Sequence, residues 1–179
     1  MSERGERVGA VLARSARPAK PGRAMTWRLG AATIARLGLA VVFAVAGWSK
    51  VTDLAGSGRA VNAYRLLPFS LAMVVGAGLP FVELALALLL LVGLATRFAA
   101  AVASLLLVVY IVAIASVWAR GLSIDCGCFG VGGDLPAGQH PNYFWDIARD
   151  VGLLAVAVLL LLSPRTVLSV DNYVLGEAA

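Results

Sequence analysis

The sequence predicts an all-α membrane protein, a bundle of four transmembrane helices, and three observations point to this class. First, 60% of the 179 residues are hydrophobic and only 14% are charged, with a mean hydropathy of +0.88. A soluble domain is nearer half apolar and a quarter charged. Second, the apolar residues gather in runs long enough to cross a bilayer. Third, these runs show no polar–apolar alternation, so helices are expected to satisfy their backbone hydrogen bonds in lipid.

The chain divides into a basic arm, one membrane domain and a short tail. The arm, residues 1–30, holds seven Lys and Arg against two acids, with two prolines and scattered Gly and Ser. This composition predicts a disordered cytoplasmic segment that sets topology, and lipid or partner binding is the alternative. The membrane domain covers residues 31–165, and the tail covers 166–179. The spans are expected at 31–49, within 69–96, at 98–119 and at 147–162.

Three features of the first two spans and their connection refine this prediction or allow a second interpretation. Ala44-Val45-Ala46 before Gly47 also resembles a signal-peptide cleavage site, although Arg36 interrupts the apolar core. The second run is longer than a bilayer needs, and Pro80 is expected to kink it or to divide a shallow approach from the span. Between the first two spans, residues 60–67 suit a short interfacial helix.

The distribution of basic residues predicts the orientation. With the N-terminus inside, the inner segments hold more Lys and Arg than the outer ones, mostly because of the arm. Both termini are then cytoplasmic, and the loop of residues 120–146 lies at the outer face of the cell membrane. The net charge of +5 and the pI near 9.8 do not indicate nucleic-acid binding, because the arm holds much of the charge and the chain lacks the aromatic interleaving that a nucleic-acid surface needs.

Both cysteines of the chain, Cys126 and Cys128, lie in this loop on either side of Gly127. Cysteines one residue apart close a tight ring, and strain makes such a disulfide easier to reduce. A ring this small removes little entropy from the unfolded chain, so it is a poor staple. Gly127 and Gly130 allow the backbone to turn around the pair. The spacing therefore favours thiol–disulfide exchange, and an inert disulfide or a pair of inert thiols is the alternative.

The neighbours of the pair act on the thiols in opposite directions. Asp125 would raise their pKa, whereas Arg120 or a nest of backbone N–H groups would lower it. The sequence leaves the balance open.

A metal site is a further alternative for the same loop. Cys126, Cys128 and His140, the only histidine, could bind zinc or copper together with Asp125 or Asp134. The Cys-x-Cys spacing is not repeated, and a lone loop histidine is commonly only solvated.

Charged residues inside the apolar runs form the second candidate site. Ionisable groups within a membrane usually face the bundle interior and pair with one another. Glu83 of the second span has Arg36 and Lys50 as possible partners, and depth along the helices favours a Lys50–Glu83 pair on the side of the cysteine loop. Such a pair would fix helix register, or it would handle protons or contact a quinone.

These motifs resemble a known family. Gly47-Trp48-Ser49-Lys50 followed by Asp53, and Leu79-Pro80-Phe81-Val82-Glu83-Leu84, resemble the signatures of DoxX-like membrane proteins, and Cys126-Gly127-Cys128-Phe129-Gly130 is similar to the MauE branch of methylamine-utilisation proteins. The resemblance covers residues 31–165 but not the arm. It implies a four-helix membrane protein associated with thiol redox chemistry, in a system where such proteins are implicated in maturing a disulfide-rich dehydrogenase subunit.

We therefore expect Cys126 and Cys128 to exchange disulfides with an extracytoplasmic partner, preferably a thioredoxin-like protein. Lys50, Glu83, Asp125, Gly127, Phe129 and Gly130 are the expected supporting residues. Because the chain has one cysteine pair only, electrons must pass to a second protein or to a quinone that reaches the pair; no bound cofactor is otherwise expected. The alternatives are a metal-binding membrane protein and a structural subunit of a membrane complex.

Overall fold

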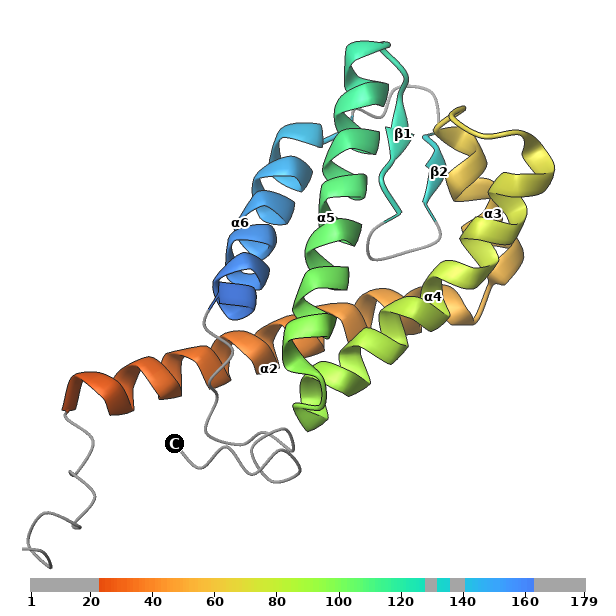
Figure 1. Ribbon diagram of the computed structural model, residues 1–179. Coiled ribbons are helices and arrows are strands. Elements are labelled where there is room, and N and C mark those ends of the chain that lie inside the picture. The colour runs from red at the N-terminus through yellow and green to blue at the C-terminus, as the bar shows by residue number, and fades with distance from the viewer. Residues whose placement is uncertain (1–22, 128–131, 136–140, 163–179) are drawn as a thin grey trace, which may run out of the picture.

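A computed structural model describes residues 23–127, 132–135 and 141–162, and the structural statements below concern these residues. Five helices and a two-stranded hairpin follow one another along this part of the chain (Figure 1). In order they are α2 (Arg23–Val51), α3 (Leu54–Ala63), α4 (Phe69–Val92), α5 (Thr96–Ala119), β1 (Ile124–Asp125), β2 (Gly133–Asp134) and α6 (Tyr143–Leu162).

The four long helices form two side-by-side pairs. α2 packs mainly against α4, and α5 packs mainly against α6 (Figure 1). A single apolar cluster joins the pairs, and each long helix supplies part of it. Its fully buried members are Leu39, Ala40, Phe43, Leu86, Ala87, Leu90, Ala99, Ala100, Ala103, Leu107, Ala157 and Leu160. Many of these side chains are alanines, which let helix backbones approach closely in a membrane.

Three helices are long and apolar enough to cross a membrane, at Leu29–Val51, Phe69–Val92 and Thr96–Ala119. The predicted all-α membrane class is therefore confirmed. The fourth apolar run forms α6, but Asp146, Arg149 and Asp150 make it more polar than the other three. Its crossing of the membrane stays a prediction.

Glycines set the closest helix contacts. A Cβ atom at Gly47 of α2 would lie 2.8 Å from Leu84 Cγ of α4, and one at Gly76 of α4 would lie 2.6 Å from Gly58 Cα of α3. Both distances are far shorter than any carbon–carbon contact, so α4 packs on α2 and on α3 at positions where a side chain would not fit.

Two predicted elements differ in the structure. The short helix was expected at 60–67, but α3 begins at Leu54, because the Asp53 carboxylate accepts a hydrogen bond from Gly56 N (2.7 Å) and caps it. It ends at Ala63, since Arg65 adopts a left-handed backbone (φ 52°) that no helix continues. Pro80 does not divide the second run, because α4 is continuous across it and buries its ring.

The first helix, the two ends of the chain and the loop before α6 also bear on the predictions. α2 begins at Arg23, inside the segment expected to be the disordered arm, so the helix is longer than the predicted first span. Residues 1–22 and the tail from residue 163 lie outside the described residues. The loop between α5 and α6 contains the β1–β2 hairpin, which the sequence did not predict.

Candidate functional site

A buried ion pair joins α2 to α4 within the bundle. Lys50 Nζ donates hydrogen bonds to Glu83 Oε1 (2.7 Å) and Oε2 (2.9 Å), and the two side chains are 6% and 0% exposed. The structure thus confirms the predicted Lys50–Glu83 pair. Lys50 lies one residue from the end of α2, while Glu83 lies near the middle of α4. Arg36, another basic residue of α2, is also buried.

A third helix completes the pair. Tyr110 of α5 donates its hydroxyl hydrogen to Glu83 Oε1 at 2.6 Å, and its ring centroid lies 5.8 Å from Lys50 Nζ. The carboxylate therefore accepts hydrogen bonds from two different helices, and the ammonium lies within reach of a cation–π contact. We call Lys50, Glu83 and Tyr110 the charged triad.

The three side chains of the charged triad stabilise one another, and none of the charges would be buried favourably alone. Removing a charge from water is costly, and a buried pair offsets that cost only when its geometry and remaining hydrogen bonds are good. Here both carboxylate oxygens accept short hydrogen bonds. The Lys50 carbonyl also accepts a hydrogen bond from Ser57 Oγ (3.3 Å), which ties the end of α2 to α3. The triad thereby links four helices at one level of the bundle.

Cys126 follows β1 directly, at the start of the connection that leads to β2. The strands pair antiparallel, with Ile124 opposite Asp134 and Asp125 opposite Gly133. Tyr64, just after α3, donates its hydroxyl hydrogen to the Cys126 carbonyl at 2.8 Å. The Asp125 carboxylate accepts a hydrogen bond from Gly127 N at 3.3 Å, which closes a local turn around the cysteine. The backbone of Cys126 is therefore held from both sides.

Two more side chains hold the hairpin to the bundle. The Tyr143 hydroxyl of α6 donates to the Leu122 carbonyl (2.6 Å) and accepts from Ile124 N (2.9 Å). Arg120 donates to the carbonyl of Tyr64 (2.6 Å). A small apolar cluster of Ala63, Ile114, Val117, Ile124 and Tyr143 lies beneath, and Cys126 packs against it. The cysteine thus lies on a supported segment.

Gly127 has a positive φ of 67°, and a Cβ there would lie 3.1 Å from Gly132 Cα and 3.6 Å from Ala60 Cβ. The residue after the cysteine therefore has to be small and left-handed, because the returning strand and α3 crowd it. This supports the predicted role of Gly127 as the residue that turns the backbone.

A cavity of about 370 Å³ connects the charged triad to the cysteine. Lys50 and Tyr110 lie in its wall, and so do Cys126, Gly127 and Tyr64. The rest of the wall is almost entirely apolar and comes from α3, α4, α5 and the α3–α4 connection: Ser57, Ala60, Val61, Leu66, Leu67, Val75, Gly76, Leu79, Leu106, Val109 and Ala113. The cysteine site and the charged site, which were predicted as two separate sites, therefore line one cavity.

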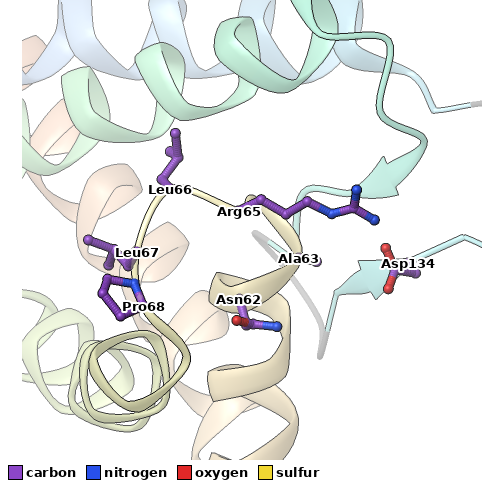
Figure 2. Close-up of a pocket in the computed structure, with 7 residues that line it drawn as sticks. All are labelled: Asn62, Ala63, Arg65, Leu66, Leu67, Pro68 and Asp134. Atoms are coloured by element: carbon purple, nitrogen blue, oxygen red, sulfur yellow. The ribbon is translucent and has the colours of Figure 1, made fainter.

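A second, more open depression of about 430 Å³ shares Leu66 and Leu67 with the wall of the cavity. Figure 2 shows Arg65 extending toward the end of this depression where Asp134 of β2 lies. Asn62, Ala63 and Pro68 form the rest of its wall. It offers both signs of charge beside the hairpin.

Several predicted residues lie outside the described part of the chain. These are Cys128, Phe129, Gly130 and His140. In the described segments no three His, Cys, Asp or Glu side chains gather as a metal site. Because the metal hypothesis depends on Cys128 and His140, it stays untested, and so does the reactivity of the cysteine pair.

Sequence reasoning missed the three tyrosines. Tyr110 carried a signal, because it is a hydroxyl-bearing residue in the middle of an otherwise apolar run. Tyr64 and Tyr143 carried none, since their carbonyl acceptors depend on how the hairpin folds back on the helices. The acidic residue Asp150 was also missed; it is buried in α6 and pairs with Arg149 at 2.9 Å.

The fold and this arrangement define a polytopic helical membrane protein with a cysteine-bearing hairpin packed over a buried charged triad. Comparison with known families narrows the class. The family described as methylamine utilisation protein MauE matches residues 28–163, most of the chain, and the protein belongs to that family. The resemblance to DoxX-like proteins stays a prediction. No curated protein and no solved structure matches the chain.

Proposed function

We propose that this membrane protein exchanges disulfides with an extracytoplasmic thiol protein through Cys126 and Cys128. The observation that carries the proposal is the placement of Cys126, whose carbonyl is held by Tyr64 and which lines the same cavity as Lys50. An inert loop cysteine would need neither a fixed backbone nor a buried charge in the same chamber. The proposed orientation has the termini in the cytoplasm and the hairpin at the outer face, where disulfides persist.

The exchange proceeds through a mixed disulfide. A thiolate of the pair attacks one sulfur of the partner's disulfide, which forms a new bond between the two proteins and releases the other partner sulfur as a thiolate. The second cysteine of the pair then attacks the mixed disulfide, so that the partner leaves reduced and the pair is oxidised. The reverse sequence oxidises the partner. A thioredoxin-like protein fits this role, because its own cysteine pair completes either direction.

The family suggests the wider task. Its description ties it to methylamine utilisation, and we propose that this chain takes part in maturing a disulfide-containing protein of that kind. The open depression beside the hairpin, with Arg65 and Asp134 on its wall, offers a surface for such a partner.

Capture of the mixed disulfide tests the proposal. Replacing the resolving cysteine, by Cys126→Ser or Cys128→Ser, should accumulate an adduct with the partner that reductant removes, while the double variant forms none. All three variants should stay inserted in the membrane. The proposal fails if neither single variant forms an adduct and the double variant keeps full function, which would leave a structural subunit.

One further variant, His140→Ala, distinguishes a metal site from disulfide exchange. A metal site would lose its function on His140→Ala as well, and the purified protein would hold about one metal ion per chain, as a closed Cys and His site does. Disulfide exchange predicts that His140→Ala leaves adduct formation unchanged.

A further inference from the structure

We propose that the cavity between the charged triad and Cys126 binds the ring of a membrane quinone, with a ring carbonyl accepting a hydrogen bond from Lys50. This deepens the proposed function and rests on it for its purpose, because it supplies an electron acceptor or donor to the cysteine pair. The binding site itself is built only from residues that the structure describes.

The cavity is placed to receive a ligand from the bilayer. α4 and α5 meet at the short turn after Val92 and diverge from there toward the hairpin (Figure 1). Val75 and Leu79 of α4 line the cavity together with Leu106 and Val109 of α5. Val75 is 40% exposed and Val109 is 51% exposed, and both belong to helices apolar enough to span the membrane. In the proposal the exposed surfaces of these two valines border lipid, and a lipid-soluble molecule would enter the cavity between α4 and α5 without crossing water.

The polar end of the cavity selects the chemistry of the ligand. An ammonium group has three N–H donors, and the described hydrogen bonds of Lys50 Nζ use two of them, both on Glu83. The third donor remains for a group in the cavity that Lys50 lines. Because Glu83 already balances the charge of Lys50, an anionic ligand such as a fatty acid or a phosphate would bring an unpaired charge into an apolar chamber. A neutral acceptor such as a quinone carbonyl meets both conditions.

The size of the cavity also suits a quinone ring. A volume of about 370 Å³ lies in the range of small-molecule pockets. It holds one substituted ring, while an isoprenoid tail would leave between Val75 and Val109 into lipid. The ring would lie against Tyr64 and Tyr110, whose aromatic faces suit a flat partner.

The electrons and protons balance between the cysteine pair and a quinone. Oxidation of two thiols to a disulfide releases two electrons and two protons, and a quinone takes up the same number in becoming a quinol. Cys126 lines the cavity, so one cysteine of the proposed exchange lies beside the proposed ring. Electrons from a partner protein would thus pass through the cysteine pair to the quinone pool, or in the reverse direction.

Photolabelling with an azidoquinone tests the site. The full chain carrying Cys126→Ser and Cys128→Ser is placed in phosphatidylcholine nanodiscs, labelled and mapped by peptide mass spectrometry. Because this variant cannot exchange disulfides, the result does not depend on the proposed function. We expect the label on α4 and α5 residues that line the cavity, and we expect decylubiquinone, but not decanol, to compete for it.

A matched pair of alanines on α5 provides the control. Ala113 lines the cavity, whereas Ala115 is exposed on the outside of the helix and does not. Ala113→Phe fills the cavity and should weaken labelling about tenfold, the effect of roughly 1.4 kcal/mol. Ala115→Phe should leave labelling unchanged. Three results would each overturn the proposal. They are label spread over the lipid-facing surfaces, equal competition by decanol, and equal labelling of Ala113→Phe and Ala115→Phe.

Discussion

The two halves of the bundle are built on different principles. The half around the α4–α5 turn, which we call the packed half, is filled by the apolar cluster that includes Leu39, Leu90 and Ala103. The half beneath the hairpin, the hairpin half, holds the charged triad, the cavity and Cys126. In the packed half all four long helices meet mainly through aliphatic and alanine side chains, with Phe43 among them, and Arg36 is buried one turn before Leu39 on α2. In the hairpin half the helices separate and polar groups join them.

The difference between the halves locates the functional part of the bundle beneath the hairpin. Interiors are close-packed wherever nothing else is required of them, and ionisable groups in a membrane are expensive. The hairpin half has both a cavity and a buried charged pair, so it gives up packing that the other half keeps. We attribute that loss to ligand and partner chemistry. Variants in each half should therefore differ in how much stability and how much chemistry they lose.

Breaking the charged triad should produce the largest effect. Lys50→Ala leaves the Glu83 carboxylate buried without its ammonium partner, and we expect a loss of about 3–5 kcal/mol in the free energy of unfolding. Unfolding of the purified protein in mixed micelles measures this loss.

The matched control for that prediction replaces both charges. Lys50→Met combined with Glu83→Met removes the pair without leaving an unpaired charge, so stability should return close to that of the wild type. Thiol exchange in this double variant should remain altered if Lys50 serves the cavity. Equal stability of Lys50→Ala and the wild type would show that the pair is not buried as described.

A cavity made in the packed half should cost stability but leave the chemistry intact. Leu90 is fully buried, whereas Leu88, two residues earlier on α4, is 61% exposed. We expect Leu90→Ala to lower the free energy of unfolding by about 2–3 kcal/mol through lost packing, and Leu88→Ala to change it little. Azidoquinone labelling and adduct formation should be unchanged in both. A specific loss of labelling in Leu90→Ala would mean that the two halves are not separate in function.

The smallest effect is expected where α3 meets α4. A methyl group at Gly76 would collide with the backbone of Ser57 and Gly58, whereas a methyl group at Gly78 meets nothing within 4 Å. Gly76→Ala should therefore destabilise the protein by about 2 kcal/mol by forcing the helices apart. It should also alter the cavity that Gly76 lines.

Gly78→Ala is the control on the same helix. It should be neutral or stabilising by about 0.5–1 kcal/mol, because alanine loses less conformational entropy in a helix. If the two alanine variants were equally stable, the close approach of α3 and α4 would be contradicted.

Much of the fold was predictable because the bilayer limits the choices. Long apolar runs left helices as the only structure, and the depth of Lys50 and Glu83 along those helices was enough to predict their pairing. Family membership was also readable, since the Cys-Gly-Cys-Phe-Gly element and the charged residues occur together in one short chain. These features depend on position along the sequence, which is visible without a structure.

The remaining features depend on how the helices are rotated and on how the loop folds back. Nothing in the sequence states that Tyr110 faces Glu83, because that requires the rotation of α5 relative to α4. The cavity has the same origin, since it exists only where α4 and α5 diverge. The hairpin was missed because its strands are two residues long, too short for an alternating pattern.

We propose that the cysteine pair is redox-active and faces outward, and thiol alkylation in intact cells is the most direct test of both properties. Cells are treated with a membrane-impermeant maleimide before and after mild reduction, and a permeant maleimide is used in parallel. We expect impermeant labelling of Cys126 and Cys128 to rise sharply after reduction and to match permeant labelling. Labelling that requires the permeant reagent would contradict the orientation, and labelling that reduction and oxidation leave unchanged would contradict the redox role.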